Sequence, residues 1–294
     1  MNPPLLLAVL SLATALSAPA QDWARVRLDK TPRHTEWVKV AHGKREVNAF
    51  ITYPEVKATA TAVIVIHENR GLTDWDRSVT DQLAEAGYIA IAPDLLSGMA
   101  PNGGSTPDFA SRDAIGKAFS SLPPDQVTAD LKAVLGYVSR LPACNGKVAV
   151  DGFCWGGGQT FRFATNEPSI KAALVFYGPA PKDDDLARIA CPVFGFYGGN
   201  DARINASIPK ITDLMRAAAK SYEPVIYDGF MRAGETPPPA ADAGQKALDD
   251  FAANKKARDE GWKRVKAILG RIQTRNPADL ITRVFRSLLL PASP

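Results

Sequence analysis

The most constraining feature of the sequence is a set of short apolar runs that are separated by helix-length segments. Residues 61–66 and 88–93 carry almost no polar side chains. Continuous apolar runs of this length are typical of parallel strands, because helices cover both faces of the sheet that contains them. Apolar residues at helical spacing lie between the runs. The alternation predicts an α/β fold, with a mostly parallel central sheet and helices on both of its faces.

The predicted elements extend over most of the 294 residues. Strands are predicted over 37–40 and 45–53, which form a hairpin, and over 61–66, 88–93, 147–151, 172–177, 192–197 and 223–227. Helices are predicted over 76–87, 125–141, 156–164, 208–220 and 245–269, and a loop rich in Gly, Pro and Ser over 94–109. No linker or internal repeat divides the chain, so a single domain is expected over residues 21–272.

The first twenty residues form a separate segment. An apolar stretch over 5–16 is followed by Ser17-Ala18-Pro19-Ala20, which has small residues where signal peptidase cleaves. This pattern predicts a signal peptide over 1–20, cleavage after Ala20 and an exported protein, periplasmic or secreted. An uncleaved lipid anchor and a misassigned start codon are the alternatives. The stretch is too short to span a membrane comfortably, so no transmembrane segment is expected in the mature chain.

Composition and cysteine positions narrow the possible classes further. The formal net charge is +4 and the cations are scattered, so the sequence gives no basis for binding nucleic acid. No metal-binding cluster or dinucleotide fingerprint is visible, and no cofactor is expected. Cys144 and Cys191 each precede a predicted strand. If a third strand separates these two, their starts lie about 9–10 Å apart, beyond the roughly 7 Å Cα limit for a disulfide, so we expect both thiols to be free.

Cys154 lies in the sequence Gly152-Phe153-Cys154-Trp155-Gly156, between a predicted strand and a predicted helix. A strand, a sharp turn and a helix around Gly-x-nucleophile-x-Gly form a nucleophile elbow, here with Cys in place of the commoner Ser. The glycines allow the tight turn and the close approach of helix to strand. The helix N-terminus is expected to lower the thiol pKa and to stabilise an oxyanion. A buried structural cysteine in a glycine-rich turn is the alternative interpretation.

Four motifs together resemble the dienelactone hydrolase family of α/β-hydrolases. They are the elbow, His-Glu-Asn-Arg-Gly at 67–71, Ala-Pro-Asp-Leu at 92–95 and Tyr-Gly-Gly-Asn-Asp at 197–201. The resemblance covers residues 37–269. It implies a single-domain α/β-hydrolase fold and an enzyme that cleaves an ester or lactone bond of a small-molecule substrate.

The resemblance also assigns roles to five residues around the predicted elbow. Cys154 corresponds to the nucleophile, which would form a thioester intermediate, and Glu68 to the glutamate that contacts the resting thiol. Asp201 corresponds to the acid that orients the catalytic histidine. The backbone N–H groups of Asn69 and Trp155 correspond to the oxyanion hole. The alternative interpretations are a carboxylate in a polar turn for Glu68 and a turn residue after a strand for Asp201.

Two arginines resemble those that hold a substrate carboxylate in the family. Arg232 matches more closely than Arg112, for which a solvated surface position is the alternative. Because arginine pairs with carboxylates through two parallel hydrogen bonds, these residues predict an acidic substrate.

The family pattern breaks at its histidine, which the resemblance places in the loop after the last strand. The three histidines of the chain all precede Cys154: His34, His42 and His67. Residues 227–229, Tyr-Asp-Gly, continue directly into Phe230 as though about four residues were deleted. Acid–base steps contribute roughly 10²–10⁴-fold to such reactions. A thiol suffers less than a hydroxyl from losing its base, so acylation is expected to survive and deacylation to be slow. His67, at the mouth of the site, is an alternative base.

Two readings of the function therefore stay open. The first is an ester or lactone hydrolase of this family that works through Cys154 with impaired turnover. The second is a catalytically inactive pseudo-enzyme that binds a small acidic ligand or a protein partner. Residues 273–294 form a C-terminal extension with an apolar stripe, which could dock on the domain, stay disordered, bind a partner or rest on an anionic membrane. The sequence predicts neither the particular substrate nor the oligomeric state.

Overall fold

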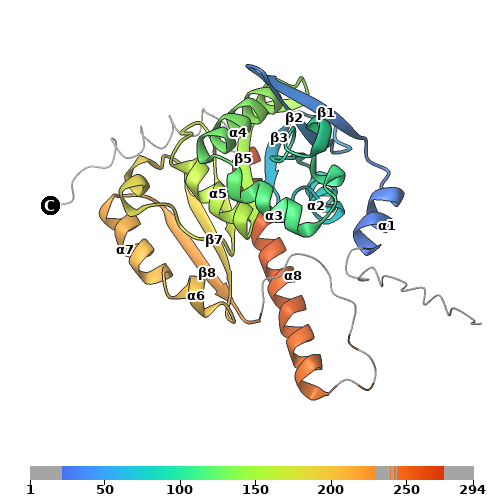
Figure 1. Cartoon of the computed structure of the whole chain (residues 1–294). Coiled ribbons are helices and arrows are strands. Elements are labelled where there is room, and N and C mark those ends of the chain that lie inside the picture. Colours follow the sequence, from blue (N-terminus) through green and yellow to red (C-terminus); the bar gives the residue numbers. More distant parts are fainter. Residues whose placement is uncertain (1–21, 230–238, 240–241, 243, 275–294) are drawn as a thin grey trace, which may run out of the picture.

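A computed structural model describes residues 22–229, 239, 242 and 244–274 (Figure 1). The described part contains an eight-stranded sheet with the strand order β1-β2-β4-β3-β5-β6-β7-β8. Its strands are β1 (Thr35–His42), β2 (Arg45–Thr52), β3 (Ala60–Ile66), β4 (Ile89–Pro93), β5 (Cys144–Phe153), β6 (Ala173–Phe176), β7 (Val193–Gly198) and β8 (Tyr222–Tyr227). The predicted signal peptide (1–20), Arg232 and residues 275–294 of the predicted extension lie outside the described residues.

The sheet is mostly parallel, as the sequence predicts. Strand β2 pairs antiparallel with β1, in the expected hairpin, and antiparallel with β4. The neighbouring pairs from β4 through β3, β5, β6 and β7 to β8 are parallel. Every residue of β3 and β4 is buried, which explains why these two strands read as continuous apolar runs.

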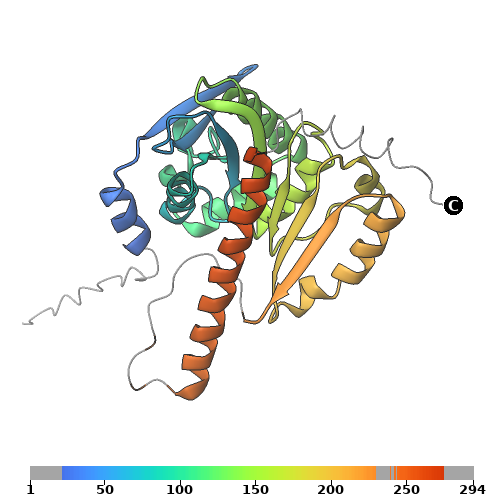
Figure 2. The same ribbon diagram turned by 180° about the vertical axis from the view of Figure 1, so that it is seen from behind.

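Helices cover both faces of the sheet, as the two opposite views show (Figure 1 and Figure 2). One face packs against α3 (Arg112–Ser121), α4 (Pro124–Ser139), α5 (Trp155–Ala164) and α7 (Ile208–Ala217). The other packs against α1 (Asp22–Lys30), α2 (Asp74–Glu85) and α8 (Gln245–Thr274). The short helix α6 (Ala202–Asn205) follows β7, and short 3₁₀ helices lie at Pro101–Gly103, Thr106–Asp108 and Asp183–Arg188. The predicted α/β architecture is confirmed.

Three described helices, α1, α3 and the four-residue α6, are absent from the sequence-based prediction. Helix α3 carries Gly116 and few large apolar residues, which weakens the helical pattern. Its start is fixed by Ser111, whose side chain accepts a hydrogen bond from the Ala114 N–H (3.2 Å). A serine at the N-cap position is a sequence signal for the start of a helix, and Ser111 could have predicted α3. Helix α1 carries many charged residues and is held to the domain by tertiary contacts.

Helix α8 extends to Thr274, beyond the predicted end at residue 269. Its last turn is bound to the sheet, since the Lys147 Nζ donates to the carbonyl oxygens of Ile272 (3.0 Å) and Gln273 (3.2 Å). The Gln273 Oε1 accepts from the backbone N–H of Thr61 (3.0 Å). These bonds satisfy the terminal carbonyl groups of a helix, which otherwise lack partners.

The three cysteines are free. Cys144 begins β5, Cys191 immediately precedes Pro192 and β7, and β6 lies between these two strands. The intervening strand keeps the two thiols apart, as expected, and the prediction of no disulfide between them is confirmed.

Asp81 joins α1 and the segment after it to α2. Its side chain is fully buried and accepts from the Arg27 Nε (2.6 Å) and from the Arg33 Nε (2.7 Å). The Thr31 hydroxyl donates to the same carboxylate. Burial by itself raises the pKa of Asp81, but the bonds from Arg33 and Thr31 and the charge of Arg27 outweigh it, so the pKa is lowered.

We expect Asp81→Ala to lower the free energy of unfolding by about 3–5 kcal/mol, because it leaves partly buried cations without their partner. Urea denaturation near neutral pH measures the change.

Since the folded pKa of Asp81 is lowered, its contribution to stability is complete above the unfolded pKa and is lost as the pH falls through the folded value. The control is Asp29→Ala, which removes an exposed pair with Arg25 (3.9 Å) and should change stability by less than about 1 kcal/mol. Equal effects of the two substitutions would contradict this account.

Candidate active site

The turn between β5 and α5 holds Cys154 in a backbone conformation that few residues adopt. Its φ is 53° and its ψ is −113°. Such sparsely populated conformations cost roughly 1–3 kcal/mol and persist only where the surroundings impose them. Here the Cys154 N–H donates to the carbonyl of Phe176 (3.0 Å), and the Cys154 carbonyl accepts from the Gly158 N–H (3.1 Å). The strand, the strained turn and the helix have the arrangement of a nucleophile elbow.

Two glycines let α5 pack directly against backbone. A Cβ atom on Gly156 would lie 2.2 Å from the carbonyl oxygen of Ile66 and 2.5 Å from that of His67. A Cβ atom on Gly152 would lie 2.3 Å from the carbonyl oxygen of Gly156. All three distances are shorter than real Cβ contacts, so any larger residue would displace the helix. The role expected for these glycines is confirmed, and it sets how close Cys154 lies to the turn after β3.

The surroundings of Cys154 favour the protonated thiol in the resting protein. Burial raises the thiol pKa, and the negative charges of Glu68 and Asp201 raise it further. The Trp155 backbone N–H and the positive charge of Arg203 lower it without reversing the shift. The helix N-terminus lowers this pKa, as expected, through the Trp155 N–H, but burial and two nearby carboxylates outweigh that contribution and the net shift is upward.

Glu68 contacts a tyrosine that the sequence analysis missed. The Tyr177 hydroxyl donates to the Glu68 Oε1 (3.3 Å). Burial raises the pKa of Tyr177 well above its usual range, and the charges of Glu68 and Cys154 add to the shift. The phenol therefore stays protonated and keeps its donor. Tyr177 directly follows β6, and a polar residue at the carboxyl edge of a parallel sheet was the signal that could have identified it.

Asp201 follows β7 and caps the short helix α6. Its Oδ1 accepts from the Ile204 N–H (3.0 Å), and its own N–H donates to the carbonyl of Gly198 (3.1 Å). Asp201 is nevertheless near enough to raise the thiol pKa of Cys154, and Arg203 of the same helix acts on that thiol with the opposite sign. The structure therefore brings Asp201 to the elbow, where its described hydrogen bonds are made to backbone.

His67 is fully buried and both of its ring nitrogens are occupied. The Leu95 N–H donates to Nε2 (3.2 Å), which leaves the proton of the neutral ring on Nδ1, where it donates to the Glu68 carbonyl (2.8 Å). Burial lowers the pKa of His67, so the ring stays neutral. The ring also stacks on Trp155, with centroids 5.7 Å apart. These contacts give His67 a structural role and leave no lone pair for it to act as a base.

The candidate oxyanion hole lies between the turn after β3 and the start of α5. The Gly71 N–H donates to the Glu68 carbonyl (3.3 Å), which closes the turn around Asn69. Among the described residues, none accepts a hydrogen bond from the Asn69 N–H. The Trp155 N–H acts on the Cys154 thiol. Two backbone donors are thus present on the two segments that the sequence analysis named.

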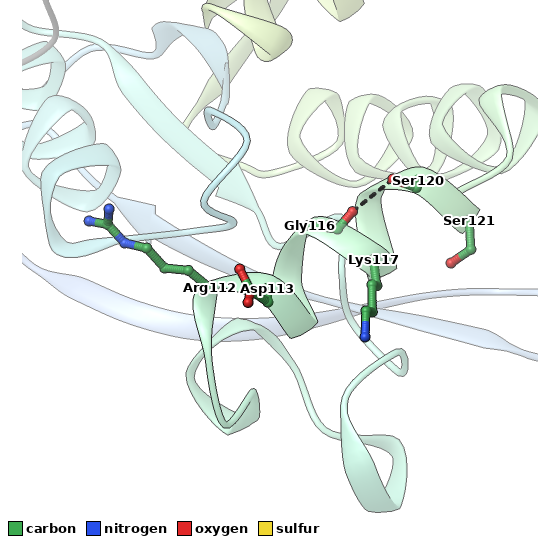
Figure 3. Close-up of a pocket in the computed structure, with 6 residues that line it drawn as sticks. All are labelled: Arg112, Asp113, Gly116, Lys117, Ser120 and Ser121. Atoms are coloured by element: carbon green, nitrogen blue, oxygen red, sulfur yellow. Dashed lines mark hydrogen bonds between the residues drawn. The ribbon is translucent and has the colours of Figure 1, made fainter.

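Arg112 lies at the start of α3, on the protein surface. It is exposed, and Figure 3 shows its guanidinium directed away from Lys117 in a shallow hollow that these two residues share with Asp113, Gly116, Ser120 and Ser121. The other end of the helix reaches the site, because the Phe119 ring packs edge-on against Trp155, with centroids 4.8 Å apart. The described geometry thus leaves Arg112 outside the group around Cys154, and a substrate contact by it stays a prediction.

The sheet and the elbow define an α/β-hydrolase. The family model described as "Dienelactone hydrolase family" matches residues 47–273, and the chain belongs to this family. The fold and the hydrolase class that the four motifs imply are therefore confirmed.

Relatives and solved structures agree with this assignment. The chain is 32% identical over 209 residues to a Salmonella typhimurium protein provisionally named carboxymethylenebutenolidase, with 65% of this chain and 76% of the relative covered. It is 29% identical over 259 residues to a Saccharolobus solfataricus protein of the same provisional name, with 77% and 95% covered. The crystal structure of a provisionally named dienelactone hydrolase from Klebsiella pneumoniae superposes with a TM-score of 0.66 at 26% identity, covering 82% of this chain and 99% of that one.

None of the described helices is both long and apolar enough to cross a membrane. In the same part of the chain, no group of three or more His, Cys, Asp or Glu side chains is arranged to hold a metal ion.

Glu68→Gln should make Cys154 more reactive, because it removes a negative charge that raises the thiol pKa. We expect iodoacetamide to alkylate Cys154 about threefold to tenfold faster at pH 8, with the pH midpoint of the reaction shifted down. Peptide mass spectrometry separates Cys154 from Cys144 and Cys191. The exposed Glu46, which pairs with Lys39 (2.7 Å), supplies the control Glu46→Gln. An unchanged or slower reaction of Glu68→Gln would refute this view of the site.

Proposed function

We propose that this dienelactone hydrolase family member cleaves an ester or lactone through a thioester on Cys154. The observation that carries the proposal is the strained backbone of Cys154 at the start of α5, with φ of 53°. A cysteine that only packs in the core does not require a strained backbone. At a sharp strand-to-helix turn, the same strain exposes the reactive atom of a nucleophile to the substrate. The provisional names of the relatives support a lactone as one substrate class.

Acylation begins when the Cys154 thiol loses its proton to Glu68, whose charge acts on that thiol. The thiolate attacks the substrate carbonyl carbon, and the N–H groups of Asn69 and Trp155 stabilise the oxyanion that forms. When the tetrahedral intermediate collapses, the bond from carbon to the leaving oxygen breaks, and that oxygen takes up the proton that Glu68 received from the thiol. In a lactone the leaving hydroxyl stays attached to the acyl group.

Deacylation needs a base for water, and the histidines of the chain do not supply one. His67 is occupied on both nitrogens, and the His42 Nε2 is hydrogen-bonded to the buried Asp130 (2.6 Å). His34 lies beside Glu36 (3.8 Å) in the segment that leads into β1. Water attacks the thioester, the C–S bond breaks and the thiol regains its proton. Because the water is poorly activated, we infer that this second half of the reaction is the slow one.

The substrate that fits best carries a carboxylate. The positive charge of Arg203 is close enough to lower the pKa of the Cys154 thiol. Arg203 is therefore a third candidate for binding a substrate carboxylate, besides the predicted Arg112 and Arg232. A guanidinium at this place would pair with a substrate carboxylate and offset the acidic character that Glu68 and Asp201 give to the site.

A catalytically inactive binding protein is the second candidate. The raised thiol pKa of Cys154 and the neutral, fully bonded His67 are the observations that favour it.

For residues 1–20 we propose removal during export, which N-terminal sequencing of the mature protein tests. A mature chain that does not start near Gln21 would overturn the export proposal.

A chromogenic aryl ester distinguishes the two candidates. We expect a burst of about one aryl alcohol per chain, followed by turnover that is slower by roughly 10²-fold or more, since deacylation lacks a histidine. Stopped-flow absorbance measures both phases, and mass spectrometry detects the acyl group on the Cys154 peptide. Cys154→Ala should abolish both phases, whereas Cys144→Ala, the matched control, should keep them. Release of alcohol that survives Cys154→Ala, or no release at all, would refute the thioester mechanism.

A further inference from the structure

Asp76 is a buried acid close to the elbow that the reaction described above does not use. It lies in the first turn of α2, at the far end of the turn that begins with Glu68, and its residue is 1% exposed. The neighbouring Trp75 ring packs edge-on against Phe153, with centroids 4.7 Å apart. Phe153 immediately precedes Cys154, so α2 is held against the elbow itself.

The two oxygens of the Asp76 carboxyl have different surroundings. Oδ2 accepts two hydrogen bonds from Thr73, one from the backbone N–H (2.8 Å) and one from the hydroxyl (2.7 Å). Oδ1 is buried and has no hydrogen-bond partner among the described residues. A buried ionised carboxylate with a bare oxygen is costly, because nothing replaces the water it has lost. The same carboxyl is tolerated when Oδ1 carries a proton.

Among the described residues, the titratable groups that interact with Asp76 are the acids Glu68 and Tyr177. Burial raises the pKa of Asp76 to about 7, and the charge of Glu68 contributes in the same direction. Asp76 in turn raises the pKa of Tyr177, whose hydroxyl donates to Glu68. The nearest cation in the sequence, Arg77, is bonded to Asp74 and lies over the Phe50 ring (5.3 Å), so its charge is engaged on the surface side of α2.

We propose that Asp76 and Glu68 act as a pair of carboxyl groups in deacylation: Glu68 is the base that takes a proton from water, and the charge on the buried Asp76 assists it. Glu68 is the member of the pair that acts on the reacting atoms, and Asp76 is a positioning residue that acts through it. The inference rests on the proposed function in one respect, namely that a Cys154 thioester has to be hydrolysed.

Each proton has a defined place in this step. With Asp76 ionised, the Glu68 carboxylate accepts a proton from water while the water oxygen forms a bond to the thioester carbon. The C–S bond then breaks, and the Glu68 proton passes to the departing sulfur, which restores the thiol. Below neutral pH Asp76 keeps its own proton, so Glu68 has less neighbouring negative charge and is a weaker base. Two neighbouring carboxyl groups can hold their protons with different strength when their surroundings differ, and enzymes use such pairs for acid–base chemistry near pH 7.

The pH dependence of deacylation tests the proposal. Asp76→Asn keeps an oxygen for the Thr73 bonds and mimics the permanently protonated acid. We expect the ratio of the wild-type to the Asp76→Asn deacylation rate to be close to one at about pH 5.5 and to rise to about threefold to tenfold at about pH 8.5, with a midpoint near pH 7. The hydroxide-driven hydrolysis that both proteins share, measured with the Glu68→Gln protein, is subtracted from each rate before the ratio is taken. A ratio that stays flat across this range would overturn the proposal.

Asp151 supplies a matched control. It is a buried acid on β5, its Oδ1 also has no hydrogen-bond partner in the described part of the chain, and burial raises its pKa well above the usual range. Asp151 is not one of the described residues whose charge shifts the pKa of Cys154 or Tyr177. The corresponding ratio for Asp151→Asn should therefore stay flat. A rise for Asp151→Asn equal to that for Asp76→Asn would assign the effect to the loss of any buried acid and overturn the proposal.

A second measurement needs neither turnover nor the activity of a variant. The infrared band of a protonated carboxylic acid that is lost in Asp76→Asn reports the ionisation of Asp76. Its midpoint should lie near pH 7 and fall when Glu68→Gln removes the neighbouring charge. An unchanged midpoint would show that the two carboxyls are not coupled and overturn the inference. Failure to form any acyl group on Cys154 would instead overturn the proposed function, so the two failures are distinguishable.

Discussion

The close backbone contact between α5 and the turn after β3 is the constraint on which the rest of the site depends. Gly156 has no room for a Cβ beside the carbonyl oxygens of Ile66 and His67, and the helix therefore begins directly against this turn. One contact thus places the thiol of Cys154, the carboxylate of Glu68 and the two candidate oxyanion donors together. The strain at Cys154 is sustained because β5, β6 and α5 all hold the same peptide groups.

Burial, more than charge pairing among the described residues, gives this site its electrostatic character. The thiol of Cys154, the phenol of Tyr177 and the carboxyl of Asp76 all have raised pKa values, and burial is the largest cause for each of them. These groups therefore favour their protonated forms in the resting site, and the negative charge of Glu68 contributes to raising all three pKa values. A site of this kind releases a proton only when a substrate or a change of pH alters the charge balance, which is why acid–base chemistry and substrate charge are coupled here.

Much of the fold was predictable because its signals are local. Buried parallel strands read as apolar runs, and the glycines around Cys154 marked the elbow before any contact was known. Helix α1 escaped prediction because its stability comes from the ion pairs of Asp81 with Arg27 and Arg33, residues distant in sequence. The extra turn of α8 likewise depends on Lys147 and Thr61, which no pattern within the helix could reveal.

The sequence by itself determined the class of fold, the family and the position of the nucleophile turn, because periodicity and glycine spacing are properties of the chain alone. The tertiary structure decided the chemical state of each group. His67 is neutral because the Leu95 N–H occupies one of its nitrogens, and the thiol of Cys154 is protonated because burial and Glu68 outweigh the Trp155 N–H. Asp76 lies near the elbow because α2 packs against it through Trp75 and Phe153. Proton affinity depends on desolvation and on neighbouring charges, and both arise only when distant segments pack together.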